Sequence, residues 1–159
     1  MVSSVVFILD NIRSVHNVGS IFRTANACGV GEIFLCGITP TPLDKKGRAR
    51  SDFAKVSLGA EQTIKWEYFE STPELIKKLR NDGYFVIAIE QDEKAVDYKT
   101  IYVRDEQKIA FIVGSEVDGI SKEVLNEVSS IAEIPMVGTK ESLNVTIALG
   151  IAVYRMLDI

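Results

Sequence analysis

Short β-branched runs alternate with longer stretches of helical spacing along almost the whole chain. Runs such as Val5 to Leu9 and Tyr84 to Ile89 are apolar without a break, as in strands that are buried on both faces. This alternation predicts an α/β fold in which helices flank a mostly parallel sheet. Strands are expected at about 5–9, 32–36, 63–68, 84–89, 108–113 and 130–134, and helices at about 17–28, 51–58, 73–81, after 121 and at 142–157.

Three expectations concern particular segments. Thr72 is expected to cap the helix at 73–81, and Ser121 the helix that follows it. The final helix is apolar on every face, so we expect it to be covered on more than one side, in part by a second copy of the chain. Residues 37–50 hold two of the four prolines and four basic residues, which predicts a mobile surface loop outside the core.

Composition narrows the class of protein. With 159 residues, 47% of them apolar, the chain is expected to fold as one domain spanning residues 1–159. Cys28 and Cys36, with His16 as the lone histidine, indicate neither a zinc site nor a disulfide framework, so we expect no metal and a reducing, cytoplasmic compartment. The N-terminal apolar run lacks the features of a signal peptide, and no run is long enough to span a membrane.

The net charge of −4 argues against a protein that coats nucleic acid by bulk charge alone. The charge is unevenly distributed, however. Residues 11–55 hold seven basic and three acidic residues, so this stretch carries +4 and the remainder −8. Any contact with a polyanion is therefore expected in the basic stretch, although a solvated run of charges would look the same.

Candidate chemistry begins after the first strand. On a helix that opens at Asn17, Arg23 projects from the face opposite the apolar stripe, one turn beyond Gly19. An arginine above a glycine near a helix N-terminus suits a phosphate or an oxyanion. A solvated arginine and an ordinary cap at Asn17 would give the same pattern.

Two further segments follow predicted strands. Residues 114–121, Gly-Ser-Glu-Val-Asp-Gly-Ile-Ser, lack the lysine of a P-loop and the Gly-x-Gly of a dinucleotide fingerprint, which disfavours an ATP- or NAD-binding enzyme. The carboxylate of Glu116 would also repel phosphate, so this turn better suits a hydroxyl or a cation. Residues 134–145 place a rigid turn before the last helix, where Ser142 is a candidate cap and Asn144 a first-turn residue that satisfies backbone groups.

Together the three segments resemble the signature motifs of the SpoU (TrmH-like) branch of the SPOUT RNA methyltransferases. The first resembles Asn-x-Gly-x-x-x-Arg-[Ser/Thr]-Ala, the second Gly-x-Glu-x-x-Gly, and the third Ile-Pro-Met-x-Gly followed by Ser-Leu-Asn-Val. Their order and spacing hold from Val5 to Met156. The matching residues are Asn17, Gly19, Arg23, Thr24 and Ala25; Gly114, Glu116 and Gly119; and Ile134, Pro135, Met136, Gly138, Ser142, Leu143, Asn144 and Val145.

The resemblance implies a SPOUT-type fold with a C-terminal trefoil knot, an obligate homodimer, and methyl transfer from S-adenosylmethionine to a ribose 2′-hydroxyl in RNA. We expect tRNA ahead of rRNA because the chain is small. It implies catalytic roles for Arg23, Asn17, Glu116, Ser142 and Asn144, with Arg23 orienting and stabilising charge because a guanidinium stays protonated. The cofactor is expected against Ile89, Glu90, Gly114, Ile134, Met136, Ser142 and Leu143.

The chain departs from many relatives in having Ser115 where they have Asn or Gln, and in showing no added RNA-binding domain. RNA is therefore expected to bind the dimeric core, with or without an accessory protein, at Arg13, Lys45, Lys46, Arg48 and Arg50. The competing interpretation is a non-catalytic RNA-binding or assembly module that keeps the knotted fold. It is motivated by the acidic net charge and the absence of an added RNA-binding domain.

Overall fold

A parallel sheet of seven strands forms the centre of the molecule in a computed structural model that describes residues 4–159. The strand order is β3-β2-β1-β6-β4-β7-β5, and every neighbouring pair runs parallel. This confirms the predicted fold class. The strands are β1 (Ser4–Asp10), β2 (Glu32–Cys36), β3 (Lys65–Phe69), β4 (Tyr84–Ile89), β5 (Val96–Asp97), β6 (Lys108–Gly114) and β7 (Ser130–Glu133).

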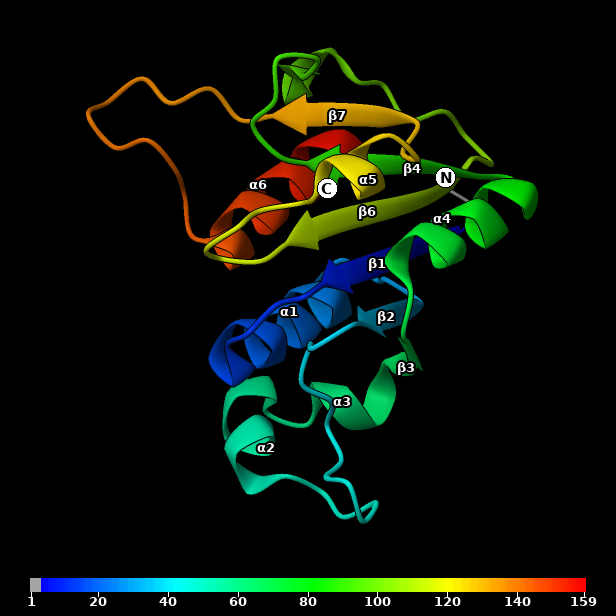
Figure 1. Cartoon of the computed structure of the whole chain (residues 1–159), viewed down its shortest axis with the longest axis vertical. Helices are drawn as coiled ribbons and strands as arrows, with labels where there is room; N and C mark the ends of the chain where they lie inside the picture. The colour runs from blue at the N-terminus through cyan, green and yellow to red at the C-terminus, as the bar shows by residue number, and fades with distance from the viewer. Residues whose placement is uncertain (1–3) are drawn as a thin grey trace.

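Helices cover both faces of the sheet (Figure 1). Alternate strand residues such as Phe7 and Phe111 face α1 and α6, whereas their neighbours Ile8 and Ile112 face α4 and α5. Both faces are thus buried, which explains the unbroken apolar strands. The helices are α1 (Val15–Ala27), α2 (Ser51–Ser57), α3 (Ala60–Thr63), α4 (Thr72–Asn81), α5 (Lys122–Leu125) and α6 (Val145–Leu157), with a 3₁₀ turn η1 (Tyr98–Thr100).

Because all strands are parallel, the segments that follow β1, β4, β6 and β7 meet at one edge of the sheet. The segment after β1 continues into α1 on one face, and the segment after β6 leads to α5 on the other. The segment after β4 leads to η1 on the face of α1, so the chain diverges on both sides of β6, and open α/β sheets bind ligands at such points. The three candidate segments of the sequence all begin at this edge.

The helix caps differ from the sequence predictions. α1 begins at Val15, and its cap is Ser14, whose hydroxyl accepts from the Asn17 amide at 3.2 Å, so Asn17 lies inside the first turn. α4 is capped by Ser71, while Thr72 donates its hydroxyl hydrogen to buried Asp10 at 2.5 Å.

α6 begins three residues later than predicted. Its cap is Asn144, whose side-chain oxygen accepts from the Thr146 amide at 2.9 Å, and not Ser142. At α5 the predicted cap Ser121 is confirmed. β5, α3 and η1 were not predicted, because elements of two to four residues are too short to show a hydrophobic periodicity.

α6 presents two different apolar faces. Leu149, Val153 and their neighbours are buried against the sheet, whereas Ile147, Ile151 and Tyr154 are 52, 39 and 42% exposed. The exposed residues lie at i, i+4 and i+7, so they form one stripe along the helix. The expected second cover is thus missing within one chain. Among the described residues, no helix is long and apolar enough to cross a membrane.

Candidate active site

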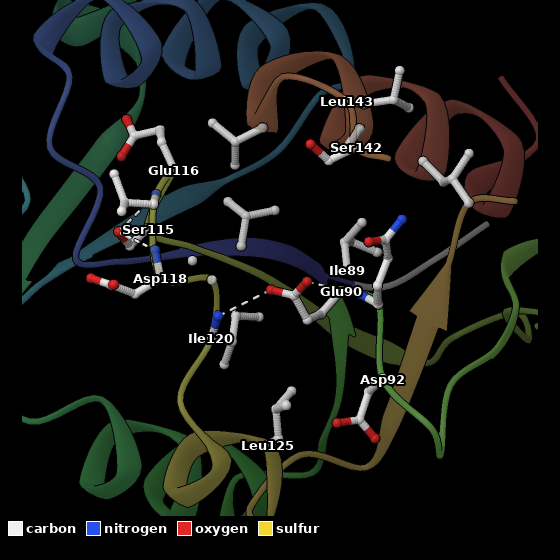
Figure 2. Close-up of a pocket in the computed structure, with 18 of the residues that line it drawn as sticks. Ile89, Glu90, Asp92, Ser115, Glu116, Asp118, Ile120, Leu125, Ser142 and Leu143 are labelled. Carbon is white, nitrogen blue, oxygen red and sulfur yellow. Dashed lines mark hydrogen bonds between the residues drawn. The ribbon is translucent and has the colours of Figure 1, made fainter. Parts of the chain in front are cut away.

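A cavity of about 660 Å³ opens at the carboxyl edge of the sheet (Figure 2). Its walls come from the segments after β4, β6 and β7 and from the start of α6. Every residue predicted to contact the cofactor lines it, as do three of the five predicted catalytic residues. The former are Ile89, Glu90, Gly114, Ile134, Met136, Ser142 and Leu143, and the latter Glu116, Ser142 and Asn144.

One wall is the tight turn that follows β6. Ser115 accepts from the backbone amide of Gly119 at 2.9 Å, and its hydroxyl accepts from those of Val117 and Asp118 at 3.3 Å. A Cβ on Gly114 would lie 2.7 Å from the backbone of Gly119, which itself has φ +66°. Gly114 is therefore required by the close approach of the chain to itself, and Gly119 by its positive φ.

Glu116 ties this turn to the segment after β1. Its carboxylate accepts from the backbone amides of Arg13 at 2.9 Å and Ser14 at 3.1 Å, and from the side-chain amide of Asn17 at 2.8 Å. Burial by itself raises the pKa of Glu116, but these donors outweigh it and hold the pKa below its ordinary value. Glu116 is therefore ionised at neutral pH, and it joins two loops that are about 100 residues apart in sequence.

Asn17 continues this connection to α6. It is buried, and its side-chain oxygen accepts from the Asn144 side-chain amide at 3.3 Å while its own amide donates to Glu116. The order Asn144, Asn17, Glu116 joins one residue from each of the three sequence motifs. The structure therefore brings these three predicted residues together, although Asn17 does not line the cavity itself.

Arg23 lies apart from this group. It is exposed on α1, does not line the cavity, and makes no hydrogen bond or ion pair with any of residues 4–159. It follows Asn17 by six residues, which places it about 9 Å further along the helix and about 120° around it.

The predicted reason for Gly19 is also wrong. A Cβ there would lie 2.9 Å from Cβ of Val56, so Gly19 makes room for α2 and does not clear a face beneath Arg23. Its place in the first motif is thus explained by the packing of α1 against α2.

The cavity is acidic. Four carboxylates line it against a single cation, Lys122, while residues such as Ile89, Leu125 and Leu143 supply apolar walls. The carboxylates are Glu90, Asp92, Glu116 and Asp118. A ligand with apolar parts and a positive charge fits this lining, and an anion such as a nucleoside triphosphate does not.

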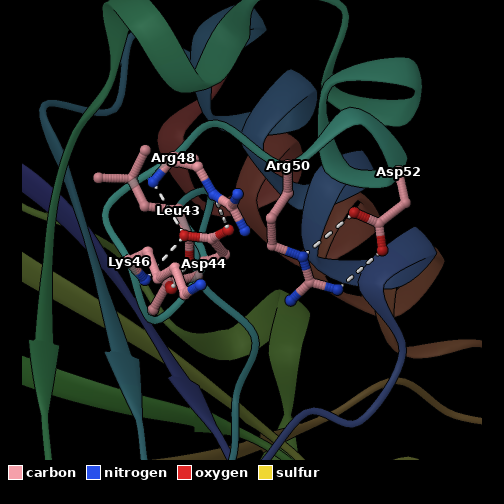
Figure 3. Close-up of polar contacts among 7 residues, drawn as sticks. Leu43, Asp44, Lys46, Arg48, Arg50 and Asp52 are labelled. Carbon is pink, nitrogen blue, oxygen red and sulfur yellow. Dashed lines mark hydrogen bonds and ion pairs between the residues drawn. The ribbon is translucent and has the colours of Figure 1, made fainter.

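The basic loop is held by its own acids (Figure 3). Asp44 accepts from the backbone amides of Lys46 and Arg48 and from Nε of Arg48 at 2.8 to 2.9 Å, and Arg50 pairs with Asp52 at 2.7 Å. Within the loop, the side chains of Arg48 and Arg50 are therefore engaged by neighbouring carboxylates.

Four other residues of the basic stretch lie in different surroundings. Thr39 is buried, accepts from the amide of Ile12 at 3.1 Å, and thereby fixes the start of the loop against the segment after β1. Arg13 lies 3.8 Å from Asp118 at the cavity. Lys45 and Lys46 are exposed and form no ion pair within residues 4–159, so they are the cations of the predicted RNA surface that are available to a partner.

Several cavity residues were missed by the sequence analysis. Gln91 and Asp92 lie two and three residues after the end of β4, and Lys122, Leu125 and Ala148 come from α5 and α6. The position of Gln91 and Asp92 at a strand end was a usable signal. Nothing in the sequence marked the other three, since their presence depends on how α5 and α6 pack.

Comparison with known proteins gives consistent matches over the whole chain. A model of the SpoU rRNA methylase family matches residues 4–154. A protein of Staphylococcus haemolyticus (strain JCSC1435), named as a TrmH family tRNA/rRNA methyltransferase, is 33% identical over 153 residues, which cover 96% of this chain and 58% of that protein. A protein of the same name from Staphylococcus aureus (strain MSSA476) is 31% identical with the same coverage. The chain thus spans little more than half the length of these curated relatives.

Solved structures share the fold. An rRNA methyltransferase from Sinorhizobium meliloti, crystallised with AdoMet, superposes with a TM-score of 0.87 at 28% identity, covering 99% of this chain and 57% of that one. A structure described in terms of 2-OH methylation of C/U34 on tRNA has a TM-score of 0.78 at 23% identity and covers 98 and 97% of the two chains. This second likeness shows the fold alone.

Proposed function

The chain belongs to the SpoU rRNA methylase family, and on that basis we propose that it transfers a methyl group from S-adenosylmethionine to a ribose 2′-hydroxyl of RNA. Both RNA classes occur in the names of its relatives. Of the two, tRNA remains the expected substrate ahead of rRNA. Residues 1–159 would act as one methyltransferase domain, with the trefoil knot that the family resemblance implies.

The observation that carries the proposal is the cavity. It holds all seven residues that the motifs assigned to the cofactor, and its volume lies within the range of small-molecule sites, about 300–1,000 Å³. S-adenosylmethionine combines an adenine ring, which suits the apolar walls, with a sulfonium and an ammonium group, which suit the four carboxylates. The bound cofactor supplies an electrophilic methyl group, and the protein has to place an oxygen in line with it.

Glu116, Asn17 and Asn144 position the groups around the reacting oxygen. Because Glu116 fixes the backbone of Arg13 and Ser14, it sets how the segment after β1 faces the cavity. Asn144 keeps one side-chain N–H on Asn17 and lines the cavity, and Ser142 lies there with a free hydroxyl within the described residues. These groups can orient a ribose hydroxyl without forming a covalent intermediate.

Arg23 requires a second chain in this proposal. In its own chain it lies outside the cavity, and its exposed guanidinium has no partner among residues 4–159. The uncovered stripe of Ile147, Ile151 and Tyr154 on α6 is a surface through which two copies would pack. We therefore propose a homodimer in which Arg23 of one copy serves the cavity of the other, stabilises charge, and leaves the hydroxyl proton to a substrate phosphate.

The proposal is tested with labelled S-adenosylmethionine and purified RNA. Wild-type protein is expected to transfer label to RNA, and Arg23→Ala is expected to lose at least about 10²-fold in rate, as when a charge-stabilising group is removed. Arg104→Ala, another exposed arginine, serves as the control and should retain activity. If Arg23→Ala stays within a few-fold of wild type, the catalytic assignment of Arg23 is wrong.

Calorimetry separates the enzyme from the alternative. Binding of S-adenosylmethionine supports an enzyme, and RNA binding without any cofactor binding would support the non-catalytic module instead.

A further inference from the structure

Glu90 is one of the four carboxylates that line the cavity. It follows β4 directly and is partly buried, and Figure 2 shows its side chain directed toward the turn after β6. Oε2 accepts from the backbone amide of Ile120 at 3.0 Å, and Oε1 accepts from the amide of Gln91 at 2.8 Å. The carboxylate is thus fixed at both oxygens, and its orientation does not depend on a ligand.

The turn makes room for this carboxylate. A Cβ on Gly119 would lie 2.6 Å from Oε2 of Glu90, so only glycine allows the carboxylate to lie against the turn. Within residues 4–159 no lysine or arginine pairs with Glu90. Two backbone amides, and no cationic side chain among these residues, therefore stabilise the Glu90 carboxylate.

A fixed carboxylate retains acceptor capacity. Its two oxygens offer about four lone-pair positions, of which two are occupied by Ile120 and Gln91. Two acceptors remain at the wall of the cavity, which matches the two donors of a vicinal diol. In other parallel α/β folds a carboxylate beyond the end of a neighbouring strand binds ribose hydroxyls. β4 is the neighbour of β6 here, so Glu90 occupies a comparable place.

We propose that the Glu90 side chain accepts hydrogen bonds from the ribose 2′- and 3′-hydroxyls of the adenosine cofactor and thereby selects a ribonucleoside. This inference rests on the proposed function, because it assumes that S-adenosylmethionine occupies the cavity. It assigns to the side chain a role that the motif resemblance did not assign. Glu90 then has two functions, since the same carboxylate also holds the turn at Ile120.

The test compares ligands that differ by a single hydroxyl. Calorimetry measures the Kd of S-adenosylhomocysteine and of its 2′-deoxy and 3′-deoxy analogues for wild type, Glu90→Ala and Glu90→Gln. Wild type is expected to bind each deoxy analogue about tenfold or more weakly, because a hydrogen bond to a charged group is lost. In Glu90→Ala the Kd of a deoxy analogue divided by the Kd of S-adenosylhomocysteine should fall to within about twofold of unity. In Glu90→Gln this ratio should be at least halved.

The ratio separates recognition from a purely structural role. Damage to the turn would weaken the binding of all three ligands by the same factor and leave the ratio of their Kd values unchanged. An unchanged ratio in both variants therefore overturns the inference. Glu93→Gln, an exposed neighbour that does not line this cavity, is the matched control and should keep the wild-type ratio. Wild type that binds S-adenosylhomocysteine but does not discriminate also overturns the inference, while the proposed function stands. If wild type binds none of the three ligands, both this inference and the cofactor assignment are wrong.

Discussion

Replacement of Glu116 by alanine is expected to reduce activity far more than stability. The change removes three hydrogen bonds, from the amides of Arg13 and Ser14 and from the side chain of Asn17. Because Glu116 is exposed to solvent, each bond contributes about 0.5 kcal/mol, the low end of the usual range, or about 1.5 kcal/mol together. For a domain of this size the melting temperature should fall by about 3–6 °C.

The effect on rate is larger because the segment after β1 loses its attachment to the cavity wall. A displacement of about 1 Å in a positioning segment costs about 10²-fold in rate, which is the loss expected in methyl transfer to RNA. Calorimetric melting and a transfer assay measure the two effects on the same preparation, with Glu123→Gln, an exposed carboxylate on α5, as control. If Glu116→Ala folds and keeps its rate within about threefold of wild type, Glu116 does not position the site.

The same carboxylate predicts a pH dependence. The pKa of Glu116 is lower in the folded chain than its ordinary value, so its contribution to stability is complete at neutral pH and is lost as the pH falls below about 4.3. The free energy of unfolding of wild type should exceed that of Glu116→Gln by a constant amount from pH 6 to 8, and this difference should shrink toward pH 3.5. Urea titrations at each pH measure it, and a difference that stays constant down to pH 3.5 would contradict the hydrogen-bond account.

Three further changes test the remaining parts of the structure. Changing both Lys45 and Lys46 to alanine should reduce the magnitude of the slope of log K against log salt for RNA binding by about 1.4–1.8 in filter-binding assays, and an unchanged slope would remove both from the interface. Ile151→Asp should convert dimers to monomers in light scattering, whereas a monomeric wild type would refute the dimer. Gly19→Ala should destabilise the chain by about 1–3 kcal/mol in urea because its Cβ would meet Val56, and a loss below about 0.5 kcal/mol would refute this packing argument.

Much of the fold was readable from the sequence because the strands are buried on both faces. The strands at 32–36 and 84–89 were predicted to the residue, since turn residues bound each apolar run. Helix starts were less accurate. Ser14, Asn17, Ser142 and Asn144 are all good capping residues, and local preference does not say which of them the rest of the structure recruits for other contacts.

The residues that line the cavity could be predicted from the sequence better than the contacts among the catalytic residues. Residues near the strand ends converge because parallel strands end at one edge, which brings Glu90, Gly114 and Ile134 together. The connection from Glu116 to the backbone of Arg13 depends on loop paths, which no spacing rule supplies. The sequence singled out Gly19 but did not explain why a glycine is needed there, because the contact of Gly19 with α2 is a tertiary one.

The most direct test of the central claim is the chemical identity of the product. Purified protein is incubated with isotopically labelled S-adenosylmethionine and with tRNA and rRNA from cells that lack the gene, and the RNA is digested to nucleosides for mass spectrometry. We predict label in a 2′-O-methylated nucleoside, at a defined position and more readily in tRNA. Label on a base, or no transfer by a protein that binds both cofactor and RNA, would contradict the proposed function.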